Sequence, residues 1–151
     1  MAIETKGPDR LNVSKKAKDI IDRIDDSDYL CLGNKSSSRS ELFLFAMALG
    51  CDTLPTPPES IYPGGLILEK AIDSSTLASI YALFLYQHKG EDIDAITNKG
   101  EVFRLAQEYA NTGFENLEDY MNTKKSDEDL AWELLRELDE QYEALEKSTL
   151  F

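Results

Sequence analysis

The longest apolar run in the chain covers residues 42–49, and its eight side chains are apolar on every side of a helix. A surface helix keeps one polar face, so a helix of this kind has to be covered by other elements. Glu41 before the run, Met47 within it and Gly50 after it favour a helix with a defined end over a buried strand. The run is far shorter than the roughly 20 residues that cross a bilayer. It therefore predicts a buried helix in a globular protein with no membrane partner.

An amphipathic segment precedes this run. Ser14 stands at an N-cap position, and the four apolar residues that follow share one helical face. They are Ala17, Ile20, Ile21 and Ile24. The alternating polar and apolar residues 9–13 predict a short strand or an extended arm before this helix. Ser38 or Ser40 is expected to cap the apolar helix, after a loop at residues 27–37.

The middle of the chain predicts an irregular connection followed by further helices. Residues 52–65 hold four prolines and two glycines, which are incompatible with a regular element. A third helix is expected to begin at Ser74 or Ser75. Later helices are expected at residues 91–97 and at residues 102–109 with an end at Gly113, and a turn or short helix is expected at residues 116–121.

The segment from Ser126 to Lys147 has the clearest helical pattern. Ser126 is a good N-cap, and the three acidic residues after it lie at the positive end of the helix dipole. Apolar residues then follow at spacings of four and three, which form a coiled-coil seam over about two heptads. The seam residues are Ala131, Leu135, Leu138, Tyr142 and Leu145. We expect this helix to pack on the protein's own core or on a partner.

These segments predict an all-α fold, a compact helical bundle of about five to seven helices with a short extended N-terminal arm. A chain of 151 residues favours one domain with an appended helix. We expect a flexible N-terminus at residues 1–8, a helical domain at 9–122 and an acidic C-terminal helix at 123–151. The N-terminus lacks the apolar stretch of a secretory signal, which favours a cytoplasmic protein.

The net charge of −13 is unevenly distributed. Residues 1–50 hold eight basic and eight acidic residues, residues 51–114 hold four and nine, and residues 115–151 hold four and twelve. Such a chain repels a polyanion unless its basic residues gather on one face. Direct DNA binding is therefore disfavoured by net charge, and the neutral first third is the place where a local basic patch can form.

Residues that support catalysis or metal binding are sparse. His88 is the single histidine, which excludes most histidine-based zinc sites, and we expect it to interact with helix carbonyls. Cys31 and Cys51 form no CxxC motif, and both are expected to be buried, reduced thiols. The carboxylate clusters at residues 91–94 and 127–129 lack the glycine and spacing of a calcium loop. The sequence predicts a protein that is not an enzyme and uses no metal or cofactor.

Residues 10–50 resemble the ribbon-helix-helix arrangement of small DNA-binding proteins. An extended stretch at residues 10–14 leads into a lysine-rich helix, and residues 38–42 open a second, apolar helix. In that family, strand residues enter the major groove and the N-terminus of the second helix contacts phosphate. The resemblance implies DNA contacts from Arg10, Asn12, Ser14, Ser38, Arg39 and Ser40.

A second resemblance covers residues 9–110. The chain is similar to the small accessory subunit of DNA phosphorothioation (sulfur modification) systems in its stretch DRLNVSKKA at residues 9–17 and in its arginine-led apolar helix at residues 39–49. That family is all-helical and is associated with DNA binding through surface lysines. The resemblance implies an accessory protein of a DNA-modification system, with Lys15, Lys16 and Lys18 as the matching lysines.

Two functions stay open from the sequence, and either implies a protein partner or a homo-oligomer. The first is a non-catalytic accessory or regulatory protein of a DNA-modification or DNA-binding system. Its candidate nucleic-acid-binding residues are Arg10, Asn12, Lys15, Lys16, Lys18 and Arg39. The second is an acidic protein-interaction module, an adaptor or DNA mimic with no direct nucleic-acid contact. Its candidate partner-binding residues are Trp132, Leu135, Leu138, Tyr142 and Leu145.

Overall fold

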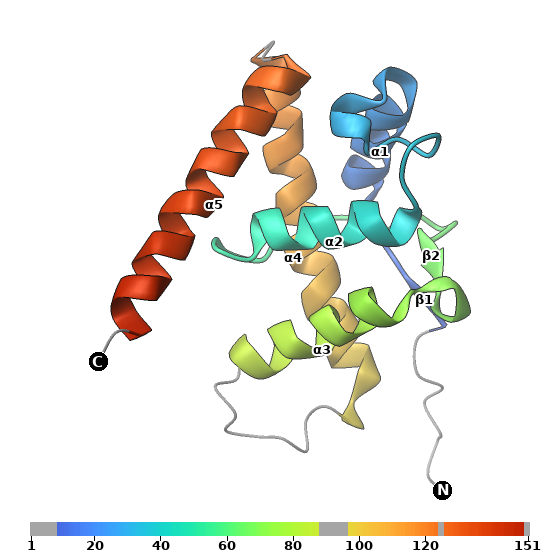
Figure 1. Ribbon diagram of the computed structural model, residues 1–151. Helices are drawn as coiled ribbons and strands as arrows, with labels where there is room; N and C mark the ends of the chain where they lie inside the picture. Colours follow the sequence, from blue (N-terminus) through green and yellow to red (C-terminus); the bar gives the residue numbers. More distant parts are fainter. Residues whose placement is uncertain (1–8, 88–96, 124–125, 150–151) are drawn as a thin grey trace, which may run out of the picture. The chain divides into compact units, whose positions relative to one another are not determined.

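The computed structural model describes residues 9–87, 97–123 and 126–149, and 71% of these residues are helical. Five α-helices and a two-stranded sheet lie in this part of the chain (Figure 1), so the all-α prediction is confirmed. The elements are β1 (Arg10–Leu11), α1 (Lys15–Ser27), α2 (Arg39–Gly50), β2 (Ile67–Leu68), α3 (Ser74–Gln87), α4 (Lys99–Asn122) and α5 (Asp127–Thr149), with short 3-10 helices at Tyr29–Cys31 and Glu69–Ala71. The chain divides within α4 into two compact units, Met1–Glu118 and Asp119–Phe151.

The first helix, α1, forms as its spacing predicts. The Ser14 hydroxyl accepts a hydrogen bond of 3.0 Å from Ala17 N, which satisfies a donor at the helix start. The predicted apolar face is buried, and it consists of Ala17, Ile20, Ile21 and Ile24. The helix ends where Asp28 adopts a left-handed backbone, with its N–H bonded to Ile24 O.

Helix α2 crosses α4 with the two backbones in contact (Figure 1). A methyl group added at Gly113 lies 1.7 Å from Ala46 O, and one added at Gly50 lies 2.1 Å from Tyr109 O. Both glycines therefore allow a closer approach than any other residue permits. The largest fully buried side chains on these helices are Phe43, Phe103 and Phe114. This crossing lies in the core of the first unit.

The predicted helix end at Gly113 is wrong. Helix α4 continues through this glycine to Asn122 and joins the helix expected at residues 102–109 to the turn or short helix expected at residues 116–121. A glycine inside a helix costs about 0.5–1 kcal/mol relative to alanine. Eleven residues of α4 are buried, and this packing outweighs the local preference.

The cover over α2 is incomplete. Leu42, Phe43, Ala46 and Met47 are buried, as the apolar run predicts. Three further apolar residues are half-buried and Ala48 is exposed; the half-buried ones are Leu44, Phe45 and Leu49. Ser38 is the N-cap of α2, since its hydroxyl accepts a hydrogen bond from Glu41 N at 3.1 Å.

The connection at residues 52–65 is irregular, as its prolines predict, and side chains of α4 hold it in place. Asn111 Nδ2 donates to Thr56 O at 3.2 Å, and Thr112 Oγ1 donates to Leu54 O at 2.8 Å. The hydroxyls of Thr56 and Thr112 lie 2.7 Å apart. Polar residues that are far apart in the sequence thus satisfy the backbone of a segment without regular structure.

The predicted N-terminal strand forms, and its partner was not predicted. Strand β1 pairs antiparallel with β2, with Arg10 opposite Leu68 and Leu11 opposite Ile67. Strand β2 has two residues, which is too short for an alternating pattern to stand out in the sequence. This pairing joins the start of the chain to the segment just before α3.

The turn after α1 contains Cys31, which the sequence predicted to be buried. Asp28, Leu30 and Cys31 all adopt left-handed backbone, with φ between 50° and 56°. The Asp28 carboxylate accepts hydrogen bonds from Gly33 N at 3.1 Å and from the Ser36 hydroxyl at 2.6 Å, which fixes this turn. The turn leaves Cys31 exposed, and Cys51 is half-buried, so the prediction of two buried thiols is wrong.

Among the described residues, no helix is both long enough and apolar enough to cross a membrane. His88 and residues 91–96 of the short helix expected at 91–97 lie outside the described residues.

Helix α3 begins at Ser74, as expected. Its first turn is capped by Asp73, whose carboxylate accepts a hydrogen bond of 2.7 Å from Thr76 N.

Candidate interaction surfaces

Arg39, a candidate phosphate ligand, is bound by an acidic residue of α1. Its Nη1 and Nη2 donate to the two Asp25 carboxylate oxygens at 2.9 and 2.6 Å, which is a bidentate ion pair. Asp25 Oδ1 also accepts a hydrogen bond from Asn34 N at 3.0 Å. The guanidinium holds the pKa of Asp25 below its usual value, and Asp25 raises the pKa of Arg39. The pair links the end of α1 to the start of α2.

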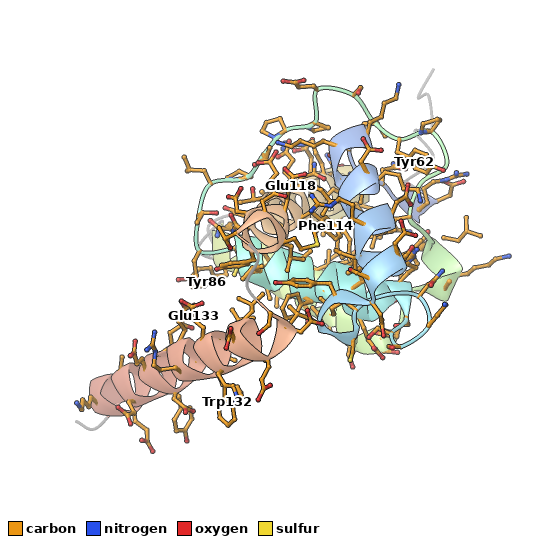
Figure 2. All side chains as sticks on the ribbon, turned by 90° about the horizontal axis from the view of Figure 1, so that it is seen from above. Tyr62, Tyr86, Phe114, Glu118, Trp132 and Glu133 are labelled. Carbon is orange, nitrogen blue, oxygen red and sulfur yellow. The ribbon has the colours of Figure 1, made fainter. Side chains whose placement is uncertain are left out.

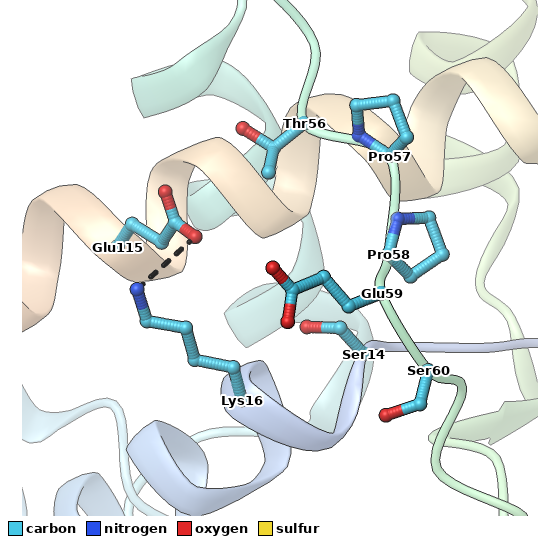
Figure 3. A pocket seen from close by; sticks show the side chains of 8 residues that line it. All are labelled: Ser14, Lys16, Thr56, Pro57, Pro58, Glu59, Ser60 and Glu115. Carbon is cyan, nitrogen blue, oxygen red and sulfur yellow. Dashed lines mark ion pairs between the residues drawn. The ribbon is translucent and has the colours of Figure 1, made fainter.

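Lys16 and Lys18 also lie beside acidic groups. Lys16 Nζ is 3.4 Å from the Glu115 carboxylate of α4 (Figure 3). Lys18 Nζ is 2.6 Å from Asp22 and 5.3 Å from the centre of the Tyr62 ring. A DNA phosphate has to compete with these interactions for either lysine.

The candidates on and beside β1 differ in whether other residues of the chain already bind them. Arg10 Nε donates to Asp9 at 3.1 Å. Asn12 N donates to Gln107 Oε1 of α4 at 2.8 Å. Lys15 is exposed and forms no ion pair within the described residues.

These six candidates do not form one compact basic patch. Arg39 is paired near the C-terminal end of α1, whereas Arg10 and Asn12 precede the N-terminal end of that helix. The stretch of α1 from Lys15 to Asp25 alone is about 15 Å long at a rise of ~1.5 Å per residue, and it lies between the two groups. The basic side chains are therefore spread from β1 to the far end of α1, and each of them except Lys15 forms an ion pair with an acidic residue within the described part of the chain.

A pocket of about 320 Å³ opens where the start of α1, the proline-rich connection and α4 meet (Figure 3). Its charged side chains are Lys16, Glu59 and Glu115, and Lys16 is already paired with Glu115. Within the described part of the chain, no three metal-ligating side chains come together. The pocket residues come from three distant segments, so no local pattern could reveal them.

The candidate partner-binding residues behave differently, because they share one exposed helix. The exposed fractions are 67% for Trp132, 52% for Leu135, 60% for Leu138, 64% for Tyr142 and 64% for Leu145. Leu130, at the start of the same helix, is fully buried. Trp132 and Glu133 extend from different sides of α5 (Figure 2). We call the five exposed residues the α5 apolar face.

Acidic residues make up half of the rest of α5. The helix holds nine Asp or Glu residues and two basic residues, Arg136 and Lys147. Ser126 caps it, since Asp129 N donates to the Ser126 hydroxyl at 3.2 Å, and three acidic residues follow in the first turn. The acidic first turn complements the helix dipole. The helix as a whole is strongly negative.

Comparison with known proteins identified no relative of the chain. No protein-family model, no curated protein and no solved structure matches the chain.

Proposed function

We propose that the chain is a non-catalytic, acidic protein-interaction module that holds a protein partner against the α5 apolar face. The supporting observation is that five large apolar side chains on one helix are each more than half exposed. Contiguous apolar patches larger than a few hundred Å² are rare on monomeric proteins and typical of protein interfaces. A partner that covers this face removes apolar area from water.

The residue types on this face support a protein partner. Tryptophan, tyrosine and leucine bring large apolar areas, and the two aromatic residues are common anchors of protein interfaces. Their spacing places Leu135, Leu138, Tyr142 and Leu145 along one side of α5, where a second helix can pack. An amphipathic helix that binds in a hydrophobic groove carries its anchoring side chains at this spacing.

The competing proposal is an accessory protein of a DNA-modification system that contacts DNA itself. Exposed Lys15 favours it, whereas the ion pairs of Lys16, Lys18 and Arg39 count against it. An accessory subunit that joins a DNA-modifying complex through α5 agrees with both the resemblance and the geometry. We therefore expect no binding of a fluorescent duplex at ~50 mM salt, measured by anisotropy. Binding that Lys15→Gln weakens would restore the direct role.

The docking proposal is tested by capture from an extract of the native host, with nuclease present. The full chain serves as bait beside the variant Leu138→Ser, which removes one apolar anchor. Leu54→Ser is the matched control, because Leu54 is 82% exposed and lies in the proline-rich connection. We expect proteins that the wild type and Leu54→Ser capture and that Leu138→Ser loses. Equal capture by all three baits contradicts docking on α5.

A further inference from the structure

We infer that the partner of α5 is a cationic amphipathic helix and not a second copy of this chain. The inference rests on the proposed function and adds the chemistry of the occupant. Two features of α5 lead to it: the geometry of its apolar face, and the charges that border that face.

The geometry fits a single helix lying along α5. Leu135, Leu138, Tyr142 and Leu145 alternate at spacings of three and four residues, which keeps them on one seam. From Leu135 to Leu145 the seam is about 15 Å long at ~1.5 Å per residue, so it matches three turns of a partner helix. A helix of that length places apolar residues of its own in the gaps between these side chains.

The border of the seam is acidic on one side. In the heptad that the seam defines, Asp139 and Glu146 follow Leu138 and Leu145 directly and flank the contact, and Gln141 stands on the other flank. Residues in these flanking positions choose the partner by charge. A partner with lysine or arginine facing Asp139 and Glu146 therefore gains attraction where an acidic helix meets repulsion.

Trp132 extends the same border toward the start of the helix. It stands seven residues before Asp139, two turns away on the same side of α5, and is 67% exposed. The face of an indole ring attracts ammonium and guanidinium groups, especially guanidinium. An arginine of the partner can stack on Trp132 while a second basic residue faces Asp139.

A second copy fits this surface poorly. Each α5 has nine acidic and two basic residues, so self-pairing brings two helices with an excess of seven negative charges into contact. In an antiparallel pair, Asp139 and Glu146 of one copy face the same residues of the other. Like charges directly opposed at an interface oppose assembly, and complementary charges set the choice of partner.

The first test uses the single tryptophan of the chain as a reporter. Three synthetic 21-residue helical peptides share one leucine seam and carry lysine and arginine, glutamine or glutamate at the flanking positions. We expect the basic peptide to shift the Trp132 emission to shorter wavelength, with an affinity about tenfold higher than that of the glutamine peptide at ~50 mM salt. The glutamate peptide should bind more weakly than either.

Two matched variants separate the border from the total charge. Asp139→Asn and Glu140→Gln each remove one negative charge from neighbouring positions, but Asp139 borders the seam and Glu140 lies away from it. We expect Asp139→Asn to weaken binding of the basic peptide about fivefold and Glu140→Gln by less than about twofold. Leu138→Ser should abolish the emission shift.

The outcomes distinguish the inference from the proposed function. Equal binding of all three peptides, with loss in Leu138→Ser, overturns the cationic partner and leaves docking on α5 in place. Self-association at neutral pH, detected by sedimentation and lost in Leu138→Ser, overturns the inference in favour of a second copy. Both the inference and the proposed function are overturned if the chain binds no peptide, stays monomeric and captures the same proteins from the extract with and without Leu138→Ser.

Discussion

At position 113 the absence of a side chain decides how two helices pack. The added methyl group of Gly113→Ala lies 1.7 Å from a backbone oxygen of α2, and a backbone cannot rotate aside as a flexible side chain can. We therefore expect Gly113→Ala to destabilise the fold by about 3 kcal/mol or more, since overpacking alone costs ~1–3 kcal/mol. Urea unfolding followed by circular dichroism measures this loss.

Gly100→Ala is the matched control for this prediction. Gly100 also lies in α4, but the nearest atom to its added methyl group is Asn98 Oδ1 at 3.5 Å, an ordinary contact. The substitution should be neutral or should stabilise the chain by up to ~1 kcal/mol, because alanine favours helix over glycine. Similar losses from both substitutions would show that helix propensity, and not the α2 crossing, governs position 113.

The ion pair between Asp25 and Arg39 gives stability a dependence on acid. The side chains are 16% and 27% exposed, so the bidentate pair is partly shielded from water. We expect Asp25→Asn to cost about 1–2 kcal/mol at pH 7. The pKa of Asp25 is lowered in the folded state, mainly by its hydrogen bonds from Arg39.

The sign of the pH effect follows from this direction. A lowered carboxyl pKa adds stability that is fully present above the ordinary value of 3.8 and is lost as pH falls through the folded pKa. The gap between wild type and Asp25→Asn should thus be constant from pH 7 to 5 and should narrow as pH falls below 3.8 toward the folded pKa. Asp26→Asn is the control, because Asp26 is exposed and carries the same charge one residue on. A gap that does not narrow at all below pH 3.8 contradicts this account.

At the scale of elements, local signals predicted where helices begin more successfully than where they end. Ser14, Ser38 and Ser126 cap helices as expected, because an N-cap depends on residues within one turn. Gly113 misled the prediction, since its role is set by α2, more than 60 residues earlier in the chain. Strand β2 was missed for a related reason: two residues form a strand only because β1 lies beside them.

The candidate sites follow the same division. The α5 apolar face could be predicted because its residues repeat along one helix, and the five expected residues are exposed together. The ion pairs of Lys16 and Arg39 could not, since Glu115 and Asp25 are distant in sequence and meet these side chains through packing. The sequence shows the basic residues near the N-terminus, but the tertiary structure decides which acidic side chains lie beside them.

The attachment of the proline-rich connection to α4 gives a prediction at the scale of elements. Asn111 is buried, accepts a hydrogen bond from Ser14 N at 3.3 Å and donates one to Thr56 O at 3.2 Å. Asn111→Ala leaves both backbone groups without this partner, which should cost about 2–3 kcal/mol. Hydrogen exchange should also accelerate in residues 53–62. Asn116→Ala, at a half-buried position of the same helix, is the control and should change neither measurement by much.

At the scale of the whole molecule, charge sets two opposing effects of salt. Salt screens the ion pairs, but nearly all of those described have at least one side chain that is more than a third exposed, and such pairs contribute at most about 1 kcal/mol each. Salt also screens the mutual repulsion of a chain with a net charge of −13. The nine acidic residues of α5 include neighbours three and four positions apart, and each such pair of like charges costs ~0.2–0.5 kcal/mol.

We therefore expect added salt to stabilise the chain. Raising sodium chloride from about 20 to 200 mM shortens the screening length from roughly 20 to 7 Å and should raise Tm by a few degrees, read by circular dichroism. The triple variant Glu137→Gln, Glu140→Gln and Glu143→Gln removes three negative charges from α5 and should respond less to salt. If Tm falls with salt in both proteins, the ion pairs outweigh the repulsion, and the acidity of α5 then imposes no strain that a cationic partner could relieve.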